Sequence, residues 1–110
     1  DAPMTYDQTL AYTTGDRTRT IQFGVKYCPD GYRAYILTPL YYGNRPSDGH
    51  TTHRYYDEAN GVYYICWDSP ITRYRELKTV IALWSELTHA YIRTGETIDR
   101  LFARMNKRRN

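Results

Sequence analysis

Residues 20–37 read TIQFGVKYCPDGYRAYIL, and the first half of this stretch alternates apolar with polar side chains. A period of two is typical of a half-buried β-strand, because successive side chains point to opposite faces of a sheet. Pro29 and Gly31 then indicate a turn, since proline restricts φ and glycine accepts a positive φ. The stretch therefore predicts a β-hairpin whose second strand covers residues 32–37.

A second hairpin is predicted further along the chain, from strands at residues 53–56 and 62–67. Asn60-Gly61, between these strands, is the strongest short turn signal in the sequence. The two hairpins are separated by residues 39–52, which are rich in Gly, Pro, Asn and Asp and are typical of a loop. Loops of this length in a compact domain are either functional or mobile.

Helical periodicity begins after the second hairpin. Ser69 is a suitable N-cap and Pro70 a suitable first residue of a helix. Apolar residues then recur at steps of three and four as far as Gly95, which is typical of the position just after a helix. A second, shorter helix is expected after Thr97, with Ile98, Leu101, Phe102 and Met105 on one face.

A short helix is also predicted near the N-terminus, over residues 5–12. Thr5 and Gln8 have the spacing of a capping box, in which each side chain bonds the backbone of the other residue. Only two turns would form before the polar residues 13–16 end the helix.

The predicted fold is α+β: an antiparallel sheet of about four strands, made of two hairpins, packs on a long C-terminal amphipathic helix. We expect the Ile21, Phe23, Val25 and Tyr27 face of the first hairpin to meet Trp84 on that helix. The length of 110 residues suits one domain. We assign residues 1–103 to this domain and residues 104–110 to a basic C-terminal tail.

Charge is distributed unevenly along the chain, which has a net charge of +3. Four of the 15 basic residues fall within the last seven positions, and all 12 acidic residues lie before them. The body of the protein is therefore close to neutral, with a net charge of −1. A short cationic segment can attract phosphate, although solvated basic ends are common.

Tyrosine is unusually frequent, with 13 residues against two Phe and two Trp. Several tyrosines are adjacent pairs, and in a strand one member of such a pair faces a core while the other faces outward. The pattern does not say which member is which. Because Tyr and Arg are enriched at interface hot spots, we predict a partner-binding sheet face from the following residues: Tyr35, Tyr42, Tyr55, Tyr63 and Arg54.

These features favour a small non-enzymatic domain that binds a protein partner, or its own copy, through a tyrosine-rich sheet face. The alternative is nucleic-acid binding by the same face, because aromatic rings stack on bases with roughly 1–3 kcal/mol each. The basic residues expected to take part in that alternative are Arg33, Arg45, Arg104, Lys107, Arg108 and Arg109. The near-neutral body favours a protein over a nucleic acid as the partner.

The sequence predicts no catalytic residues and no cofactor. It contains no glycine-rich phosphate loop, no H-E-x-x-H motif and no C-x-x-C pair. His50 and His53 are weak metal-ligand candidates, because a zinc site normally needs at least three protein ligands.

The cysteines indicate the cellular compartment, and the length of apolar runs indicates whether the chain can enter a membrane. Cys28 and Cys66 are too few for a disulfide-rich scaffold. They favour a cytoplasmic protein with free thiols, and a secreted protein with one Cys28–Cys66 disulfide is the alternative. No apolar run approaches the ~20 residues that span a bilayer, so we expect no membrane partner.

Overall fold

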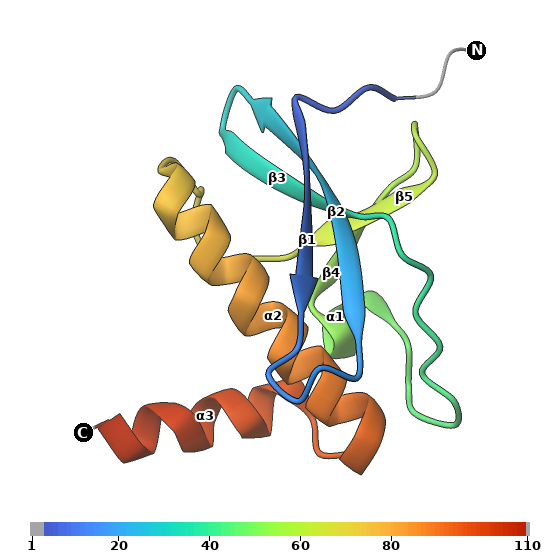
Figure 1. The fold of residues 1–110 in the computed structure, drawn as a ribbon, viewed down its shortest axis with the longest axis vertical. Coiled ribbons are helices and arrows are strands. Elements are labelled where there is room, and N and C mark those ends of the chain that lie inside the picture. Colours follow the sequence, from blue (N-terminus) through green and yellow to red (C-terminus); the bar gives the residue numbers. More distant parts are fainter. Residues whose placement is uncertain (1–3, 110) are drawn as a thin grey trace.

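A computed structural model describes residues 4–109, with side chains described as far as residue 107. Within these residues, five strands and three helices form one α+β unit (Figure 1). The α+β class is confirmed, and the sheet has one strand more than the four expected. In chain order the elements are β1 (Gln8–Thr13), β2 (Thr20–Cys28), β3 (Gly31–Ile36), α1 (Gly49–Thr52), β4 (Arg54–Asp57), β5 (Val62–Ile65), α2 (Tyr74–Thr94) and α3 (Ile98–Arg109).

The strands form a single antiparallel sheet in the order β1-β2-β3-β5-β4 (Figure 1). The two predicted hairpins are confirmed as β2–β3 and β4–β5. They are joined through β3 and β5, where Tyr35 lies opposite Tyr64. This join brings two tyrosine-containing strands side by side, although they are far apart in the sequence.

The fifth strand, β1, corrects the helix that the sequence predicts over residues 5–12. Residues 8–13 pair with β2 along their whole length, from Gln8 opposite Val25 to Thr13 opposite Thr20. Leu10 and Tyr12 then lie on the face that packs against the core. Pairing with β2 and partial burial of these two side chains outweigh one local capping signal.

The loop at residues 39–52 ends in a single helical turn, α1. The Asp48 side chain accepts a hydrogen bond of 3.1 Å from the backbone nitrogen of Thr51, and His53 ends the turn with φ 53°. Thr52 is buried. The last part of the loop is therefore packed against the body of the protein and presents the start of β4 to the sheet.

Helix α2 begins at Tyr74, so the predicted start at Ser69 and Pro70 is wrong. The preceding segment is held in an extended path, because the Ile71 carbonyl accepts a hydrogen bond of 2.8 Å from the Tyr32 nitrogen. Ile71 is also buried in the core. The predicted end is confirmed, since Gly95 has φ 81° and its nitrogen donates to the Tyr91 carbonyl at 2.8 Å.

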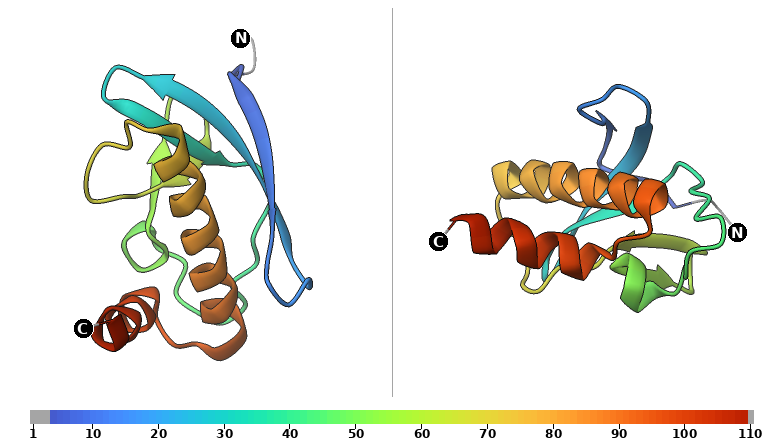
Figure 2. Two further views of the ribbon diagram at one scale, coloured as in Figure 1. Left: turned by 60° about the vertical axis from the view of Figure 1, so that its left-hand side comes forward. Right: turned by 90° about the horizontal axis from the view of Figure 1, so that it is seen from below.

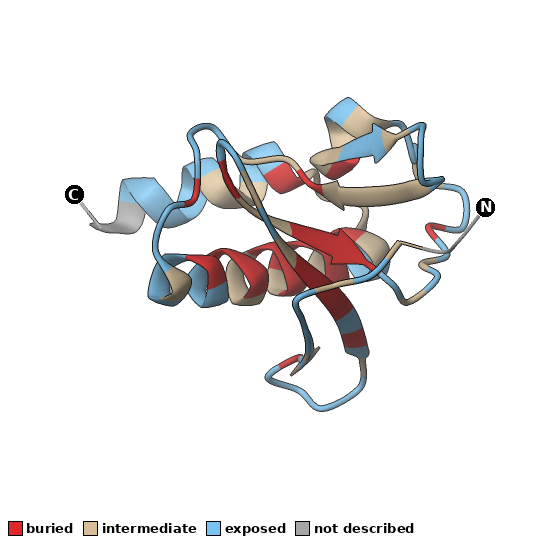
Figure 3. Cartoon of the chain, turned by 90° about the horizontal axis from the view of Figure 1, so that it is seen from above, coloured by how far each residue is buried: buried red, intermediate tan, exposed pale blue. Residues whose placement is uncertain are grey.

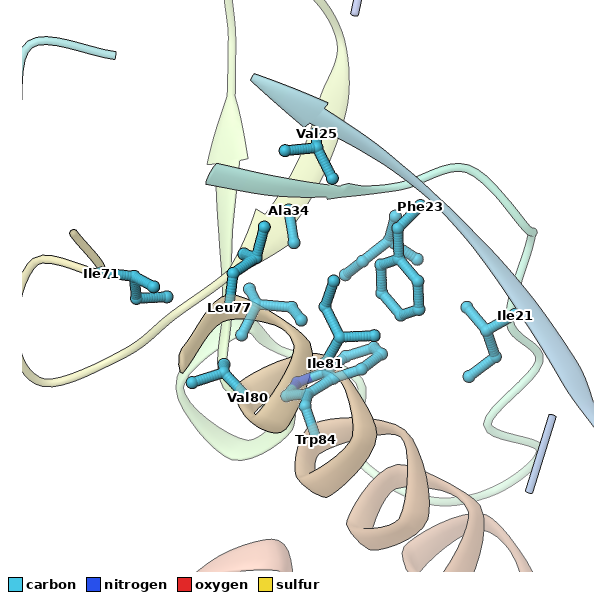
Figure 4. Close-up of a cluster of buried hydrophobic side chains, with 11 residues drawn as sticks. Ile21, Phe23, Val25, Ala34, Ile71, Leu77, Val80, Ile81 and Trp84 are labelled. Carbon is cyan, nitrogen blue, oxygen red and sulfur yellow. The ribbon is translucent and has the colours of Figure 1, made fainter. Parts of the chain in front are cut away.

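The main core lies between the sheet and α2 (Figure 4), and Figure 3 shows the buried residues of α2 along one side of the helix. Phe23 meets Trp84 edge to face with ring centroids 6.0 Å apart. The expected packing of β2 on Trp84 is thus confirmed for Ile21, Phe23 and Val25. Tyr27, at the end of the strand, is exposed instead.

A second cluster of buried residues attaches the long loop and α3 to α2; it comprises Tyr42, Leu87, Tyr91 and Ile98. The Tyr91 hydroxyl donates to the Pro46 carbonyl at 2.7 Å. Helix α3 follows the C-terminal end of α2 and turns back toward the side where α2 begins (Figure 2). It runs to residue 109, so the basic residues from 104 onward continue this helix rather than following it.

The turn between β1 and β2 is attached to α2 by a network of hydrogen bonds around the partly buried side chain of Asp16. One carboxylate oxygen accepts from His89 Nε2 at 2.8 Å and from Arg93 at 2.9 Å, and the other accepts from the Thr18 nitrogen at 3.0 Å. The hydrogen bonds from His89 and Thr18 hold the pKa of Asp16 well below its usual range. The folded state therefore favours the charged carboxylate.

Asp16→Asn is expected to lower the free energy of unfolding at about pH 5. At about pH 2.5 the free energies of unfolding of the variant and the wild type should differ less. A lowered pKa in the folded state contributes stability above the ordinary value of about 4, and this contribution is lost as the pH falls below it. Urea unfolding at the two pH values measures the effect. Asp30→Asn, in the exposed β2–β3 turn, is the control. An equal loss of stability in both variants would contradict a stabilising role of the charged Asp16 carboxylate.

Candidate functional site

Four tyrosine rings form a continuous row on the outer face of the sheet, the face opposite α2. We call this the tyrosine row: Tyr6, Tyr35, Tyr64 and Tyr55. Successive ring centroids lie 5.7, 5.3 and 5.6 Å apart. The row crosses β3, β5 and β4 in the order in which the strands pair.

The alternation of each strand explains why these rings face outward. In β3, Ala34 and Ile36 enter the core beside α2, so Tyr35 between them points to the other side. In β5, Ile65 is in the same core, and Tyr64 therefore faces outward. Tyr55 is the cross-strand partner of Tyr64 in β4, and partners lie on the same face.

Tyr35 is the buried centre of the row, with 2% of its surface exposed. The ring of Tyr6 covers it on one side and occupies the space above Gly24, where an added Cβ would lie 2.6 Å from that ring. The Tyr35 hydroxyl donates to Asp57 Oδ2 at 2.8 Å. Burial, with a smaller contribution from Asp57, raises the pKa of Tyr35. The phenol is thus held protonated and in one orientation.

Tyr64 and Tyr55 form the accessible end of the row. The Arg33 guanidinium lies 4.6 Å from the Tyr64 ring centroid, in cation–π contact. Tyr55 is 52% exposed, and the neighbouring Cys66 side chain raises its pKa. A hollow of about 230 Å³ adjoins these three side chains and is also lined by Asp68. The row therefore ends in an exposed ring beside a small depression.

Two of the five predicted partner-binding residues, Tyr35 and Tyr55, belong to the row. Tyr42 does not, because it is buried against Tyr91 in the second cluster. The expectation that Tyr42 faces outward is wrong; its neighbour Tyr41 is the exposed member of that pair, at 81%.

Tyr63 and Arg54 also lie elsewhere, on the α2 side of the sheet. Tyr63 packs at the edge of the main core. The Arg54 guanidinium is held between two aromatic rings, 3.9 Å from the Tyr63 centroid and 5.0 Å from the Tyr42 centroid. It also donates to the Ser47 carbonyl at 2.8 Å. These contacts make Arg54 a structural link between β4 and the long loop.

Tyr6 and Tyr64 are members of the row that the sequence prediction missed. For Tyr64 a signal exists, since its neighbour Ile65 is the more apolar residue and takes the core position. For Tyr6 the signal is weaker: a glycine in the middle of β2 indicates that another group approaches the sheet closely.

The basic residues proposed for nucleic-acid binding do not gather on one surface. Arg33 lies on the outer face of the sheet, whereas Arg45 lies against Gly95 and donates to the Arg93 carbonyl at 3.5 Å. Arg104, on α3, is paired with Glu96 through two hydrogen bonds of 2.7 and 2.9 Å. Lys107 is exposed on the same helix. The side chains of Arg108 and Arg109 lie outside the described part of the chain.

The histidines and cysteines take part in local structure. His53 Nε2 lies 2.8 Å from Asp99 Oδ1, and His50 belongs to the α1 turn. Within residues 4–109, no three His, Cys, Asp or Glu side chains are grouped so that they could hold a metal ion. Cys28 and Cys66 are both half-buried and are not bonded to each other.

Comparisons of this chain with protein-family models, curated proteins and solved structures give no match. None of the helices between residues 4 and 109 has the length and apolar character needed to cross a lipid bilayer.

Proposed function

We propose that this protein is a small non-enzymatic binding domain that engages a protein partner through the tyrosine row. The observation that carries the proposal is the row itself: four rings in contact on the sheet face opposite α2, with Arg33 stacked on one of them. Tyrosine and arginine are the residue types that dominate binding energy at protein interfaces.

The row is also preorganised, which supports its use in binding. Tyr35 is anchored by Asp57 and covered by Tyr6, so it provides a fixed support for Tyr64. Tyr64 in turn supports Tyr55 at a centroid distance of 5.6 Å. Ordering flexible side chains costs about 0.5–1.5 kcal/mol each on association, and rings that are already packed avoid much of this cost.

The mixed charge around the row favours a protein over a nucleic acid. Arg33 is the cation in contact with the row, and it is accompanied by the carboxylates of Asp57 and Asp68. Nucleic-acid binding depends on several cations that neutralise phosphates together. The basic residues of α3 lie on a different part of the molecule and do not supply them.

Tyr55→Ala is expected to lower affinity for the partner by at least about tenfold while the protein stays folded, because truncating a hot-spot residue costs about 2 kcal/mol or more. The partner is captured from a lysate on immobilised wild-type protein and then titrated against the variants. Tyr41→Ala removes an equally large and more exposed ring outside the row, and it should leave affinity unchanged.

Three other outcomes are informative. An equal loss of affinity in both variants would contradict a role for the row. Binding of single-stranded DNA at about 50 mM salt that is lost in Tyr55→Ala would favour the nucleic-acid alternative. Self-association that is lost in the same variant would identify the partner as a second copy of the chain.

A further inference from the structure

A second surface, separate from the tyrosine row, lies along the side of α2 that faces α3. There residues of α2, α3 and β1, the edge strand, line an open groove of about 800 Å³. Its floor is a row of α2 residues spaced three or four apart, and most of them are small: Thr79, Ala82, Glu86 and Ala90. Small side chains allow the backbone of another helix to approach closely.

The walls of the groove are apolar. Leu101 and Met105 of α3 line one side, and the ring of Tyr12 from β1 also contributes. Met105 is one of the most exposed large apolar side chains in the described chain. Leu83 of α2, which is half-buried, lines the same groove. The partly exposed apolar residues are therefore gathered at one groove rather than scattered over the surface.

The charged side chains that line this groove are three cations and one acid, Arg75, Lys78, Arg104 and Glu86, and Arg104 is paired with Glu96. Arg75 and Lys78 stand at one end, and neither is in an ion pair within the described residues. Glu86 is the acid on the floor, and its carboxylate already accepts from the Tyr12 hydroxyl and from the Gly15 nitrogen, at 2.5 and 2.8 Å. The hydrogen bond to Glu86 raises the pKa of Tyr12 to about 12.

We propose that this groove binds an acidic amphipathic helix of a partner protein. Between Arg75 and Ala90 the groove extends about 22 Å along α2, at about 1.5 Å per residue. This length matches a helix of three to four turns laid into an apolar groove. The cations at its rim would meet acidic side chains that flank the apolar stripe of the bound helix.

Two other occupants fit the surface less well. A second copy of this chain would bring its own exposed helical cations, such as Lys78 and Lys107, toward the same positive rim, and like charges repel. A lipid surface is bound by helices that present their apolar face outward, whereas this apolar surface is recessed between α2 and α3. The proposal does not depend on the tyrosine row, which lies on the other side of the sheet.

The probe is a designed helical peptide of about 18 residues, with leucines at steps of three and four and glutamates flanking them. A second peptide with lysine in place of each glutamate is the charge control. In methyl NMR spectra of the full chain, the acidic peptide should shift Ala82, Ala90 and Met105, and the lysine peptide should not. Lys78→Glu should weaken the acidic peptide about 3- to 10-fold at low salt, on the scale of surface charge pairs.

Lys107→Glu makes the same change on an exposed helical lysine that does not line the groove, and it should leave the peptide affinity within about twofold. Tyr55→Ala should also leave the peptide affinity unchanged. A groove that does not bind the peptide is therefore distinguishable from a tyrosine row that does not bind a partner. The inference is overturned if the groove methyls do not respond to millimolar acidic peptide, or if both peptides bind equally.

Two further results would replace the proposed occupant. Concentration-dependent shifts of the same methyls without peptide would identify a second copy of the chain. Binding to vesicles containing phosphatidylserine, weakened equally by Lys78→Glu and Lys107→Glu, would identify a membrane surface.

Discussion

Replacing Trp84 with alanine is expected to lower the free energy of unfolding by about 3–5 kcal/mol. The indole is almost fully buried and packs edge to face on Phe23 at the centre of the core. Its Nε1 also donates to the carbonyls of Thr52 and His53, both at 3.2 Å. The substitution removes the largest buried side chain and the link between α2 and the start of β4. Urea unfolding measures the loss.

Two variants test this interpretation of Trp84. Trp67→Ala removes the same ring from a half-buried position at the edge of the core, so a smaller loss of about 1–2 kcal/mol is expected. Trp84→Phe keeps an aromatic ring and removes the donor, and it should cost about 1–3 kcal/mol. Equal losses for Trp84→Ala and Trp67→Ala would contradict the central position of Trp84.

Gly31→Ala is expected to cost roughly 3 kcal/mol, because it combines backbone strain with a steric clash. Gly31 has φ 129°, a conformation that side chains with a Cβ rarely adopt, and an added Cβ would lie 2.7 Å from the Ile71 carbonyl oxygen. In the wild-type protein the Ile71 backbone packs closely on Gly31, and this packing holds the extended segment before α2 against β3. Chemical denaturation of the variant measures the cost, and a lower midpoint with an unchanged slope is expected.

Gly43 provides a matched control for this effect. It also has a positive φ, 61°, but no atom lies within 4 Å of a Cβ added there. Gly43→Ala should therefore cost only the conformational part, about 1 kcal/mol. Similar losses at Gly31 and Gly43 would contradict the close packing of residue 71 on the start of β3.

The elements that the sequence predicts well are those whose signal is repeated along the chain. The alternation in β2 and the three-to-four spacing in α2 each involve many residues, so both elements and the end of α2 at Gly95 are correct. The helix predicted at residues 5–12 and the start of α2 at Ser69 depended on one capping signal each. Long-range pairing with β2 and with Tyr32 determined those segments instead.

The tyrosine row could be predicted only in part, because adjacent tyrosines do not show which ring faces outward. The burial of Ile65 places Tyr64 outward, and this depends on which face α2 covers. Tyr42 lies in a loop, where alternation between faces does not apply. Tyr6, in the segment before β1, joins the row by folding over Gly24 of β2, a contact that local sequence does not encode.

The two proposed surfaces have different chemistry and lie on different sides of the molecule. The tyrosine row offers phenol rings with mixed charge, and the groove between α2 and α3 offers apolar walls with a positive rim. Because the surfaces lie apart, we expect Tyr55→Ala to affect only the first and Lys78→Glu only the second.

The most direct test of the tyrosine row is the solvent accessibility of single tyrosine rings in the free protein and in its complex with the captured partner. Tyr55 and Tyr56 are neighbours on β4 with nearly equal exposure, 52% and 51%, on opposite faces of the sheet. Binding through the row should protect Tyr55 and Tyr64 from chemical labelling and leave Tyr56 reactive. A complex in which Tyr56 is protected while Tyr55 stays as reactive as in the free protein would contradict the proposal.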